Sequence, residues 1–284
     1  MDSRPSDEAR SEAPTAEVRA DSPLAGVRGL LIDVDGVLHV GMRAVPGAAA
    51  ALDALASDGI PSRLLTNTTT ASRATLGGRL REIGLPVADE ALITAPVATA
   101  AYVRRRWPTA RCYLLTKGDA ADDFRAEHVR LVGDDAAARG EADVVVIGGA
   151  EEDLTYERLN WVFRLLLGGA RLVAMHRNRS WRTVDGMRLD SGPFVRALEE
   201  AAGVRAITVG KPAAPFFRQG LRALDLAAAE VAMVGDDAPN DLAPARRLGM
   251  RTVLVRTGKP VGPADEAHAD EVLDSIADLP RSLA

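Results

Sequence analysis

Two acidic turns in the sequence carry carboxylates at a spacing that suits a metal or phosphoryl site. The first is Asp33-Val-Asp35-Gly-Val-Leu, whose aspartates are two residues apart and so share one face of an extended strand. The second is Gly235-Asp236-Asp237, followed by Asp241. Two carboxylates about 4 Å apart repel each other by roughly 4 kcal/mol at an effective dielectric constant of 20. If both turns belong to one sheet, this cluster needs a cation.

The chemistry of these side chains favours Mg²⁺ as that cation. Carboxylate oxygens are the ligands that Mg²⁺ prefers, and the four histidines and single cysteine show no shared spacing that would suit Zn²⁺. Each turn alone also has a structural interpretation, because Asp and Gly are common turn formers. Asp237 and Asp241 are equally suited to capping a helix N-terminus.

Two further segments carry polar groups that suit an anion. Thr66 and Asn67 end an apolar run with a hydroxyl and free backbone donors near a predicted helix start, although simple helix capping explains them equally well. Lys211 follows another apolar run in Gly210-Lys211-Pro212. Lysine occurs only at positions 117, 211 and 259, against 32 arginines, so a lysine at this point is unexpected by chance. A point ammonium charge suits neutralisation of a phosphate or carboxylate.

Apolar runs alternate with helical patterns, which predicts parallel sheets with right-handed crossovers and therefore an α/β fold. The predicted strands are 29–36, 62–67, 111–116, 143–149, 171–176, 206–210, 230–237 and 251–256. The predicted helices are 46–59, 71–84, 96–107, 155–168, 193–202, 215–226 and 239–248. The strand–helix rhythm of the first segment returns after the middle of the chain, which favours one core over 26–87 plus 203–284, with an inserted α/β domain over 88–202. In open α/β sheets, ligands bind beyond the carboxyl ends of the strands, where both acidic turns fall.

The composition narrows the class of protein. The 284 residues are 47% apolar and 26% charged, with a net charge of −5, which is typical of a globular protein of about two domains and disfavours a nucleic-acid binder. A single cysteine, Cys112, excludes an internal disulfide and fits a reducing compartment. Residues 1–25 are predicted to be a disordered tail, with no apolar segment of a signal peptide. We therefore expect a cytoplasmic protein that binds neither membrane nor nucleic acid.

The four segments, in this order, resemble the motifs of the haloacid dehalogenase (HAD) superfamily of phosphatases. Asp33-Val-Asp35-Gly-Val-Leu is similar to the first motif and Thr66-Asn67 to the second. Lys211 is similar to the third, and Gly235-Asp236-Asp237 with Asp241 to the fourth. The insertion between the second and third motifs has the position of a type C2 cap. The resemblance thus implies a Rossmann-like core with a parallel sheet and an inserted α/β cap domain.

Three stretches narrow this resemblance to subfamily IIA, the NagD-like group. They are TNTTT (66–70), SGPFVRALE (191–199) and VGKP (209–212). Within the group, the sequence is most similar to the phospholysine/phosphohistidine/inorganic pyrophosphate phosphatase branch. The resemblance implies hydrolysis of a small phosphorylated molecule, and relatives that associate through the cap suggest a homodimer.

The resemblance also implies a two-step reaction that depends on Mg²⁺. Asp33 would attack phosphorus to form an aspartyl-phosphate, and Asp35 would protonate the leaving oxygen and then activate water. The Asp33 and Asp236 carboxylates and the Asp35 backbone carbonyl would bind the metal ion.

Other residues would hold the substrate and support the metal. Thr66 and the backbone of Asn67 would bind phosphoryl oxygens, and Lys211 would offset negative charge on the nucleophile and phosphate. Asp237 and Asp241 would orient metal-bound waters and Lys211.

One segment of the predicted cap is rich in positive charge. His176-Arg-Asn-Arg-Ser-Trp-Arg182 follows a strand, and we hypothesise that Arg177, Arg179 or His176 reaches the leaving group of the substrate. A solvated basic turn is the alternative. The segment lacks the Asn-Pro-Asp loop of many NagD-like members, so their nucleotide-like specificity does not carry over.

Two other functions remain open beside a phosphatase. A dehalogenase would use the same nucleophile but needs neither a metal nor a second acid, so Asp35 with Asp236 argues against it. A catalytically silent binding module on this fold would be expected to lack one of the key groups, yet Asp33, Asp35, Lys211 and Asp236 are all present.

Overall fold

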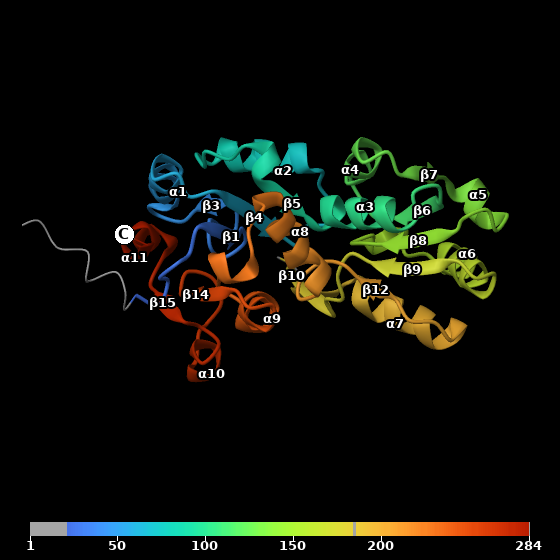
Figure 1. Cartoon of the computed structure of the whole chain (residues 1–284). Helices are drawn as coiled ribbons and strands as arrows, with labels where there is room; N and C mark the ends of the chain where they lie inside the picture. The colour runs from blue at the N-terminus through green and yellow to red at the C-terminus, as the bar shows by residue number, and fades with distance from the viewer. Residues whose placement is uncertain (1–21, 184–185, 284) are drawn as a thin grey trace, which may run out of the picture.

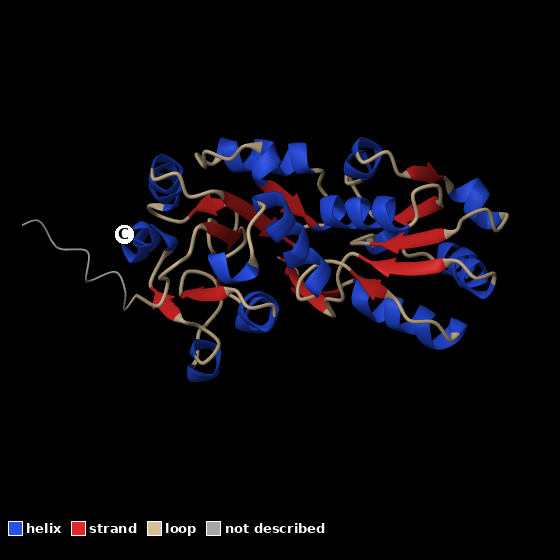
Figure 2. Ribbon diagram, viewed as in Figure 1, coloured by secondary structure: helices blue, strands red, loops and turns tan. Residues whose placement is uncertain are grey.

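The computed structural model describes residues 22–183 and 186–283, so most of the predicted tail at 1–25 lies outside the described residues. Two sheets, each covered by helices, form two lobes that lie side by side along the long axis of the molecule (Figures 1 and 2). We call them the core lobe, built on the six-stranded sheet, and the cap lobe, built on the five-stranded sheet. The described residues include no helix that is long and apolar enough to cross a membrane.

The core sheet is entirely parallel, in the order β15-β14-β13-β1-β4-β5. Its strands are β1 (Gly29–Asp33), β4 (Ser62–Thr66), β5 (Leu92–Thr94), β13 (Val231–Gly235), β14 (Arg251–Val255) and β15 (Glu271–Leu273). Side chains alternate between its two faces. Leu30 and Ile32 pack with helices α1 (Ala48–Ser57) and α11 (Leu279–Leu283), whereas Leu31 packs on the other face with Phe216 and Phe217 of α8 (Ala214–Leu224).

The cap sheet is also entirely parallel, in the order β12-β9-β8-β6-β7. Its strands are β6 (Arg111–Leu115), β7 (Arg130–Val132), β8 (Val144–Ile147), β9 (Arg171–Ala174) and β12 (Ile207–Thr208). Two short antiparallel hairpins flank the sheets: β2 (His39–Val40) with β3 (Arg43–Ala44), and β10 (Ser180–Thr183) with β11 (Gly186–Leu189).

Eleven α-helices of the described chain cover the sheets. They are α1 (Ala48–Ser57), α2 (Arg73–Glu82), α3 (Ala95–Arg106), α4 (Ala121–Ala126), α5 (Asp134–Ala138), α6 (Tyr156–Leu167), α7 (Ser191–Ala202), α8 (Ala214–Leu224), α9 (Ala243–Arg247), α10 (Pro263–Glu266) and α11 (Leu279–Leu283). Their ends follow local sequence signals. Side-chain oxygens of Ser72, Thr94, Thr155 and Asp190 cap α2, α3, α6 and α7, and Gly203 ends α7 in a left-handed conformation.

The lobes change over later in the sequence than the predicted domain boundaries at 87/88 and 202/203. The core sheet continues past residue 88, and the cap sheet continues past residue 203. β5 pairs with β4 in the core sheet, and β12 pairs with β9 in the cap sheet. Helix α3 lies between the lobes, where it packs against α4 of the cap lobe and α8 of the core lobe. One continuous apolar cluster therefore contains Leu31 of β1, Val103 of α3 and Val146 of β8.

The predicted helix over 239–248 is interrupted in the structure. Residues Ala238–Leu242 form a π-helical turn, η5, and α9 begins only at Ala243. Pro244 has no backbone N–H and cannot donate to residue 240, so a regular α-helix cannot run through this point. The wider turn keeps Asp241 buried next to the end of β13.

Candidate active site

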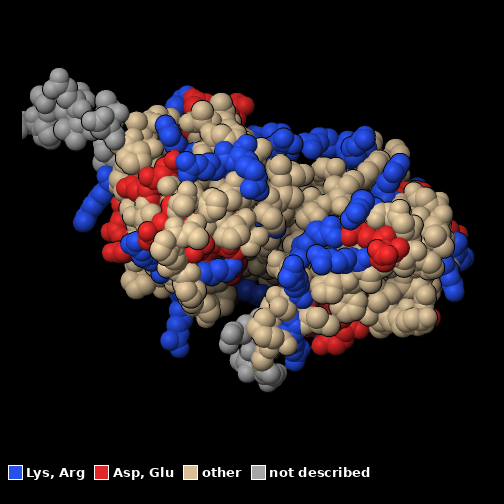
Figure 3. Space-filling view, turned by 90° about the horizontal axis from the view of Figure 1, so that it is seen from below, with Lys and Arg blue, Asp and Glu red and all other residues tan. Residues whose placement is uncertain are grey.

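The candidate site is a cavity of about 580 Å³ between the two lobes. Residues that follow β1, β4, β13 and β14 of the core lobe line it, together with residues that follow β8 and β9 of the cap lobe. The carboxyl ends of both parallel sheets thus open onto the same space. The hollow between the lobes is visible in the space-filling view (Figure 3).

A buried lysine between two aspartates forms the centre of the site. Lys211 Nζ lies 2.6 Å from Asp33 Oδ1 and 2.9 Å from Asp241 Oδ1, and all three side chains are buried. Burial alone would lower the pKa of Lys211, but the charges of Asp241 and Asp33 outweigh it and raise that pKa. The lysine is therefore held as an ammonium ion. The backbone N–H of Val34 also donates to Asp33 Oδ1 at 2.7 Å.

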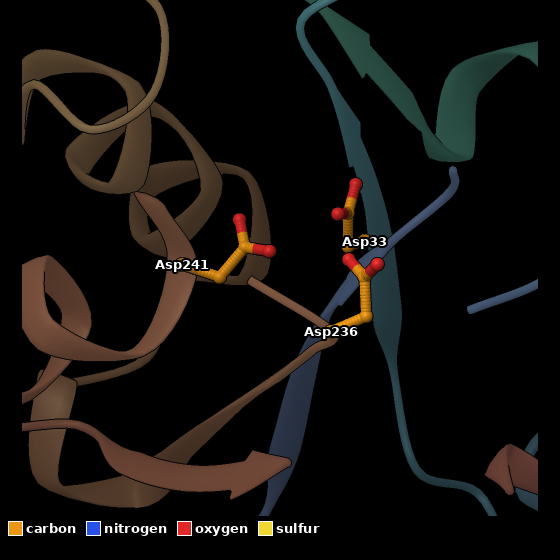
Figure 4. Close-up of side chains that lie close together, drawn as sticks. All are labelled: Asp33, Asp236 and Asp241. Carbon is orange, nitrogen blue, oxygen red and sulfur yellow. The ribbon is translucent and has the colours of Figure 1, made fainter. Parts of the chain in front are cut away.

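A third carboxylate, Asp236, makes the cluster strongly acidic. Carboxylate oxygens of Asp33, Asp236 and Asp241 lie within 4.8 Å of one another, and Figure 4 shows the three side chains converging. Burial, and then the charge of Asp33, raises the pKa of Asp236 to about 6 and that of Asp241 well above its usual value. One ammonium ion does not balance three carboxylates.

The donor set fits a hard divalent cation such as Mg²⁺. Its atoms are carboxylate oxygens, which Mg²⁺ prefers. Oδ2 of Asp241 is fully buried and has no hydrogen-bond partner among the described residues, although such an atom normally has one. A cation at this point would satisfy that oxygen and offset the excess negative charge.

Asp35 lies at the mouth of the site with an exposed side chain. Thr66 Oγ1 donates a hydrogen bond of 2.9 Å to Asp35 Oδ2, and His39 Nε2 lies 3.5 Å from Asp35 Oδ1. The backbone N–H of Thr68 donates in turn to Thr66 Oγ1 at 3.1 Å. These contacts hold one carboxyl group in a fixed position while it faces the cavity.

The side chain of Asn67 holds the backbone of Lys211. Asn67 Nδ2 donates to the Lys211 carbonyl oxygen at 2.9 Å, and Asn67 Oδ1 accepts from the Lys211 N–H at 2.8 Å. We expected Lys211 to follow a strand of the core sheet. Because β12 pairs with β9, the lysine instead follows a cap-sheet strand, and the Asn67 amide joins it to the core lobe.

Two glycines allow the backbone to approach Asp236. Gly36 has a φ of +86°, and a Cβ atom there would lie 2.3 Å from Asp236 Oδ2. A Cβ atom at Gly258 would lie 2.0 Å from the same oxygen. The next residue, Lys259, donates its backbone N–H to Asp236 Oδ2 at 2.9 Å. The segment after β14 therefore fixes the orientation of this carboxylate.

Lys259 is a cavity residue that the sequence analysis missed. Its ammonium group contacts Asp237, which also accepts 2.7 Å and 3.2 Å hydrogen bonds from the side chain and backbone of Asn240. Burial would raise the pKa of Asp237, but Lys259 and Asn240 outweigh it and lower that pKa. The rarity of lysine, which we applied only to Lys211, was the available signal for Lys259.

The cap lobe forms hydrogen bonds to the core loop that follows Thr66 and Asn67. Gly149 N–H donates to Thr69 Oγ1 at 3.0 Å, and Thr116 Oγ1 donates to the Thr69 carbonyl oxygen at 2.9 Å. Asp119 accepts 2.8 Å hydrogen bonds from both the N–H and the hydroxyl of Ser72 at the start of α2. The position of the cap lobe is thus tied to the loop beside the reactive groups.

The basic segment of the cap lobe divides between two faces. His176 and Asn178 line the cavity, whereas Arg177 and Arg179 line a different cavity on the cap lobe. Neighbouring residues of an extended segment point to opposite sides, which accounts for this division. Arg179 is therefore not brought to the candidate site, and Arg177 pairs with buried Glu199. Burial lowers the pKa of His176, against the opposing charge of Asp190, and favours a neutral ring.

Comparisons with known proteins agree with this geometry. A family model described as haloacid dehalogenase-like hydrolase matches residues 30–130, and a second, described as HAD-hydrolase-like, matches residues 208–279. The rat (Rattus norvegicus) haloacid dehalogenase-like hydrolase domain-containing protein 2 is 38% identical over 233 residues, which cover 82% of this chain and 85% of the relative. The human (Homo sapiens) phospholysine phosphohistidine inorganic pyrophosphate phosphatase is 34% identical over 265 residues, covering 90% and 93%.

The same relationship appears among solved structures. The p-nitrophenyl phosphatase from Archaeoglobus fulgidus superposes with a TM-score of 0.82 at 29% identity, covering 90% of this chain and 99% of the other. NagD from Escherichia coli, at 24% identity and a TM-score of 0.78, shows the shared fold. The chain belongs to the haloacid dehalogenase superfamily of hydrolases. The predicted NagD-like resemblance and the predicted fold class, a parallel α/β core with an inserted α/β cap, are confirmed.

Proposed function

We propose that this chain is a Mg²⁺-dependent phosphatase that hydrolyses a small phosphorylated molecule through an aspartyl-phosphate intermediate on Asp33. The observation that carries the proposal is the pairing of Lys211 with Asp33 and Asp241 beside Asp236 at the floor of an interlobe cavity. A cavity of about 580 Å³ suits a small molecule better than a folded protein substrate.

The acidic cluster supplies the proposed metal site. Asp33, Asp236 and Asp241 provide carboxylate oxygens close enough to share one ion. When bound, Mg²⁺ would offset the charge of the phosphoryl group and polarise its oxygens. Asp241 was expected only to orient waters and Lys211; its unpartnered buried oxygen supports a direct part in binding the ion.

In the proposed first step, a carboxylate oxygen of Asp33 forms a bond to phosphorus while the bond from phosphorus to the leaving oxygen breaks. The carboxylic acid form of Asp35 gives its proton to that oxygen. Lys211 lies against the nucleophile, where its ammonium charge stabilises the negative charge that spreads over the phosphoryl oxygens. Asn67, which follows β4 and lines the cavity, would orient the phosphoryl group through its backbone N–H, while the hydroxyl of Thr66 is engaged with Asp35.

In the proposed second step, the Asp35 carboxylate removes a proton from a water molecule, which attacks phosphorus. The bond between phosphorus and Asp33 breaks, which releases inorganic phosphate and restores the Asp33 carboxylate. Thr66 keeps Asp35 in place for both proton transfers. A dehalogenase has no use for such a second acid, so the fixed position of Asp35 favours phosphatase chemistry.

The test is hydrolysis of para-nitrophenyl phosphate with Mg²⁺, with EDTA, and by an Asp33→Asn variant. Asp53→Asn is a matched control, because Asp53 is an exposed aspartate on α1, away from the cavity. We expect activity from the wild type and the control with Mg²⁺, and none from Asp33→Asn or in EDTA. Full activity in Asp33→Asn would overturn the proposal.

A further inference from the structure

Two apolar side chains from opposite lobes are exposed at the cavity. Val40 of the β2–β3 hairpin belongs to the core lobe and is 50% exposed. Trp181 of the β10–β11 hairpin belongs to the cap lobe and is 41% exposed. Both line the cavity that contains Asp33 and Lys211. Tryptophan is usually well buried, so a half-exposed indole on the wall of a reactive cavity indicates a ligand surface.

In the proposed reaction, these two side chains would face the leaving group. Asp35 is the proposed donor of a proton to the leaving oxygen, and Val40 comes five residues after it. The backbones of Asp35 and His39, the residue before Val40, are paired in an isolated β-bridge. The cavity-lining residues of the cap lobe that accompany Trp181 include His176 and Asn178, which are not phosphate ligands in the proposed reaction. The phosphoryl group is held on the core side, so the indole is left to contact the rest of the substrate.

We infer that the substrate carries its phosphoryl group on a planar aromatic leaving group that stacks on Trp181 and contacts Val40. This inference rests on the proposed function and names the substrate class of the same site. Offset or edge-on packing of two aromatic rings adds an attraction beyond the area that they bury. An aliphatic leaving group fills the same space without that attraction, so Trp181 is a specificity-determining residue.

Because the cavity wall is charged, the effect of an aromatic leaving group is best measured with substrates whose leaving groups carry no charge. Glu151, which pairs with Lys117, and Asp190, which contacts His176, line the cavity, and so do Lys211 and Lys259, which pair with aspartates. A charged leaving group would respond to these groups as well as to Trp181. Phenyl phosphate and propyl phosphate both have uncharged leaving groups, so the comparison of these two esters isolates the effect of the aromatic ring.

The hairpin offers a matched control. Met187 lies on the paired strand β11, is 62% exposed and is not among the described residues that line the cavity. The experiment measures kcat/KM for both esters in the wild type, Trp181→Ala, Trp181→Phe and Met187→Ala, with Mg²⁺. Each substrate is compared with itself across variants, so the different reactivity of the two esters cancels.

We expect Trp181→Ala to lower kcat/KM for phenyl phosphate by roughly threefold to tenfold, and for propyl phosphate by about twofold or less. Trp181→Phe should retain most of the activity on phenyl phosphate, and Met187→Ala should change neither value. Equal losses on both esters, or no loss, would overturn the inference while leaving the phosphatase in place. A wild type that hydrolyses neither ester with Mg²⁺ would overturn the proposed function, and the inference with it.

Discussion

Asp236→Asn is expected to stabilise the metal-free protein. The Asp236 carboxyl is 6% exposed, and burial together with the charge of Asp33 raises its pKa from 3.8 to about 6. A carboxyl whose folded-state pKa lies above its unfolded value costs stability wherever it is ionised in both states. Each tenfold difference in proton affinity is worth about 1.4 kcal/mol, so ionised Asp236 costs about 3 kcal/mol at pH 7.5. Asparagine removes that charge and retains an acceptor for the Lys259 N–H.

The stability difference between Asp236→Asn and the wild type should depend on both pH and Mg²⁺. As the pH falls through about 6 towards 3.8, the folded protein takes up the proton first, so the cost declines, to about half at pH 5. The advantage of Asp236→Asn over the wild type should decline with it. Mg²⁺ should have the opposite effect, because it stabilises the wild type by mass action and the variant lacks one proposed ligand.

The assay is thermal unfolding in EDTA and in Mg²⁺, at pH 7.5 and pH 5. In EDTA at pH 7.5 the variant should unfold about 6 °C above the wild type, from about 2 °C per kcal/mol for a chain of this size. In Mg²⁺ the difference in unfolding temperature between the variant and the wild type should disappear or change sign. Asp53→Asn should unfold at the wild-type temperature under all four conditions. A variant that unfolds at or below the wild-type temperature in EDTA would refute the reasoning that burial and the charge of Asp33 make ionised Asp236 destabilising.

Three further changes test the supports of the site. In Gly258→Ala, the new Cβ would lie 2.0 Å from Asp236 Oδ2 and displace that carboxylate. Mg²⁺ should therefore no longer stabilise the variant in thermal unfolding, and kcat should fall at least 100-fold. An unchanged response to Mg²⁺ would contradict this. Asn67→Asp keeps the acceptor for Lys211 but loses the donor, so kcat should fall roughly 10- to 100-fold at similar KM. Asn160→Asp on α6, at a residue that does not line the cavity, should have no such effect. Asp119→Ala removes the hydrogen bonds to the start of α2, so urea denaturation should show a loss of about 3 kcal/mol, and a loss below about 1 kcal/mol would mean that these bonds contribute little.

The parallel α/β fold could be predicted because buried strands and amphipathic helices alternate clearly in the sequence. The predicted strands over 29–36, 62–67, 230–237 and 251–256 correspond to β1, β4, β13 and β14, in each case shorter at the carboxyl end, where the acidic and polar turns begin. Short strands such as β5 and β15 were missed. Their three-residue runs carry too little periodicity to be distinguished from loops.

The sheet to which a strand belongs could not be predicted from the same patterns. The run over 206–210 is apolar wherever it lies, and its place beside β9 depends on contacts between residues far apart in sequence. For the same reason, the Asn67 amide was not expected to bond to Lys211, which is 144 residues away. Asp33, Asp35, Thr66 and Asp236 do converge, because carboxyl ends of parallel strands share an edge; their catalytic roles stay predictions.

The basic cap segment shows where composition misleads. Three arginines in seven residues suggested contacts with the substrate, but charge density does not determine which side of an extended segment faces the cavity. The structure turns Arg177 and Arg179 away from the candidate site and leaves Trp181 there. Alternation counted from buried His176 separates His176 and Asn178 from Arg177 and Arg179, but it breaks at Ser180 and would not have placed Trp181 at the cavity.

The apolar cluster that runs from β1 through α3 to β8 has a consequence for protein engineering. A cap transplanted from a relative by cutting at residues 87 and 202 would carry α3 with it, together with the face that packs on α8 of the recipient. The recipient would then meet a foreign surface inside its own interior. Chimaeras that exchange substrate preference should therefore replace only the β10–β11 hairpin, whose described residues contribute nothing to that cluster, and keep α3 together with the cap strands that pack on it.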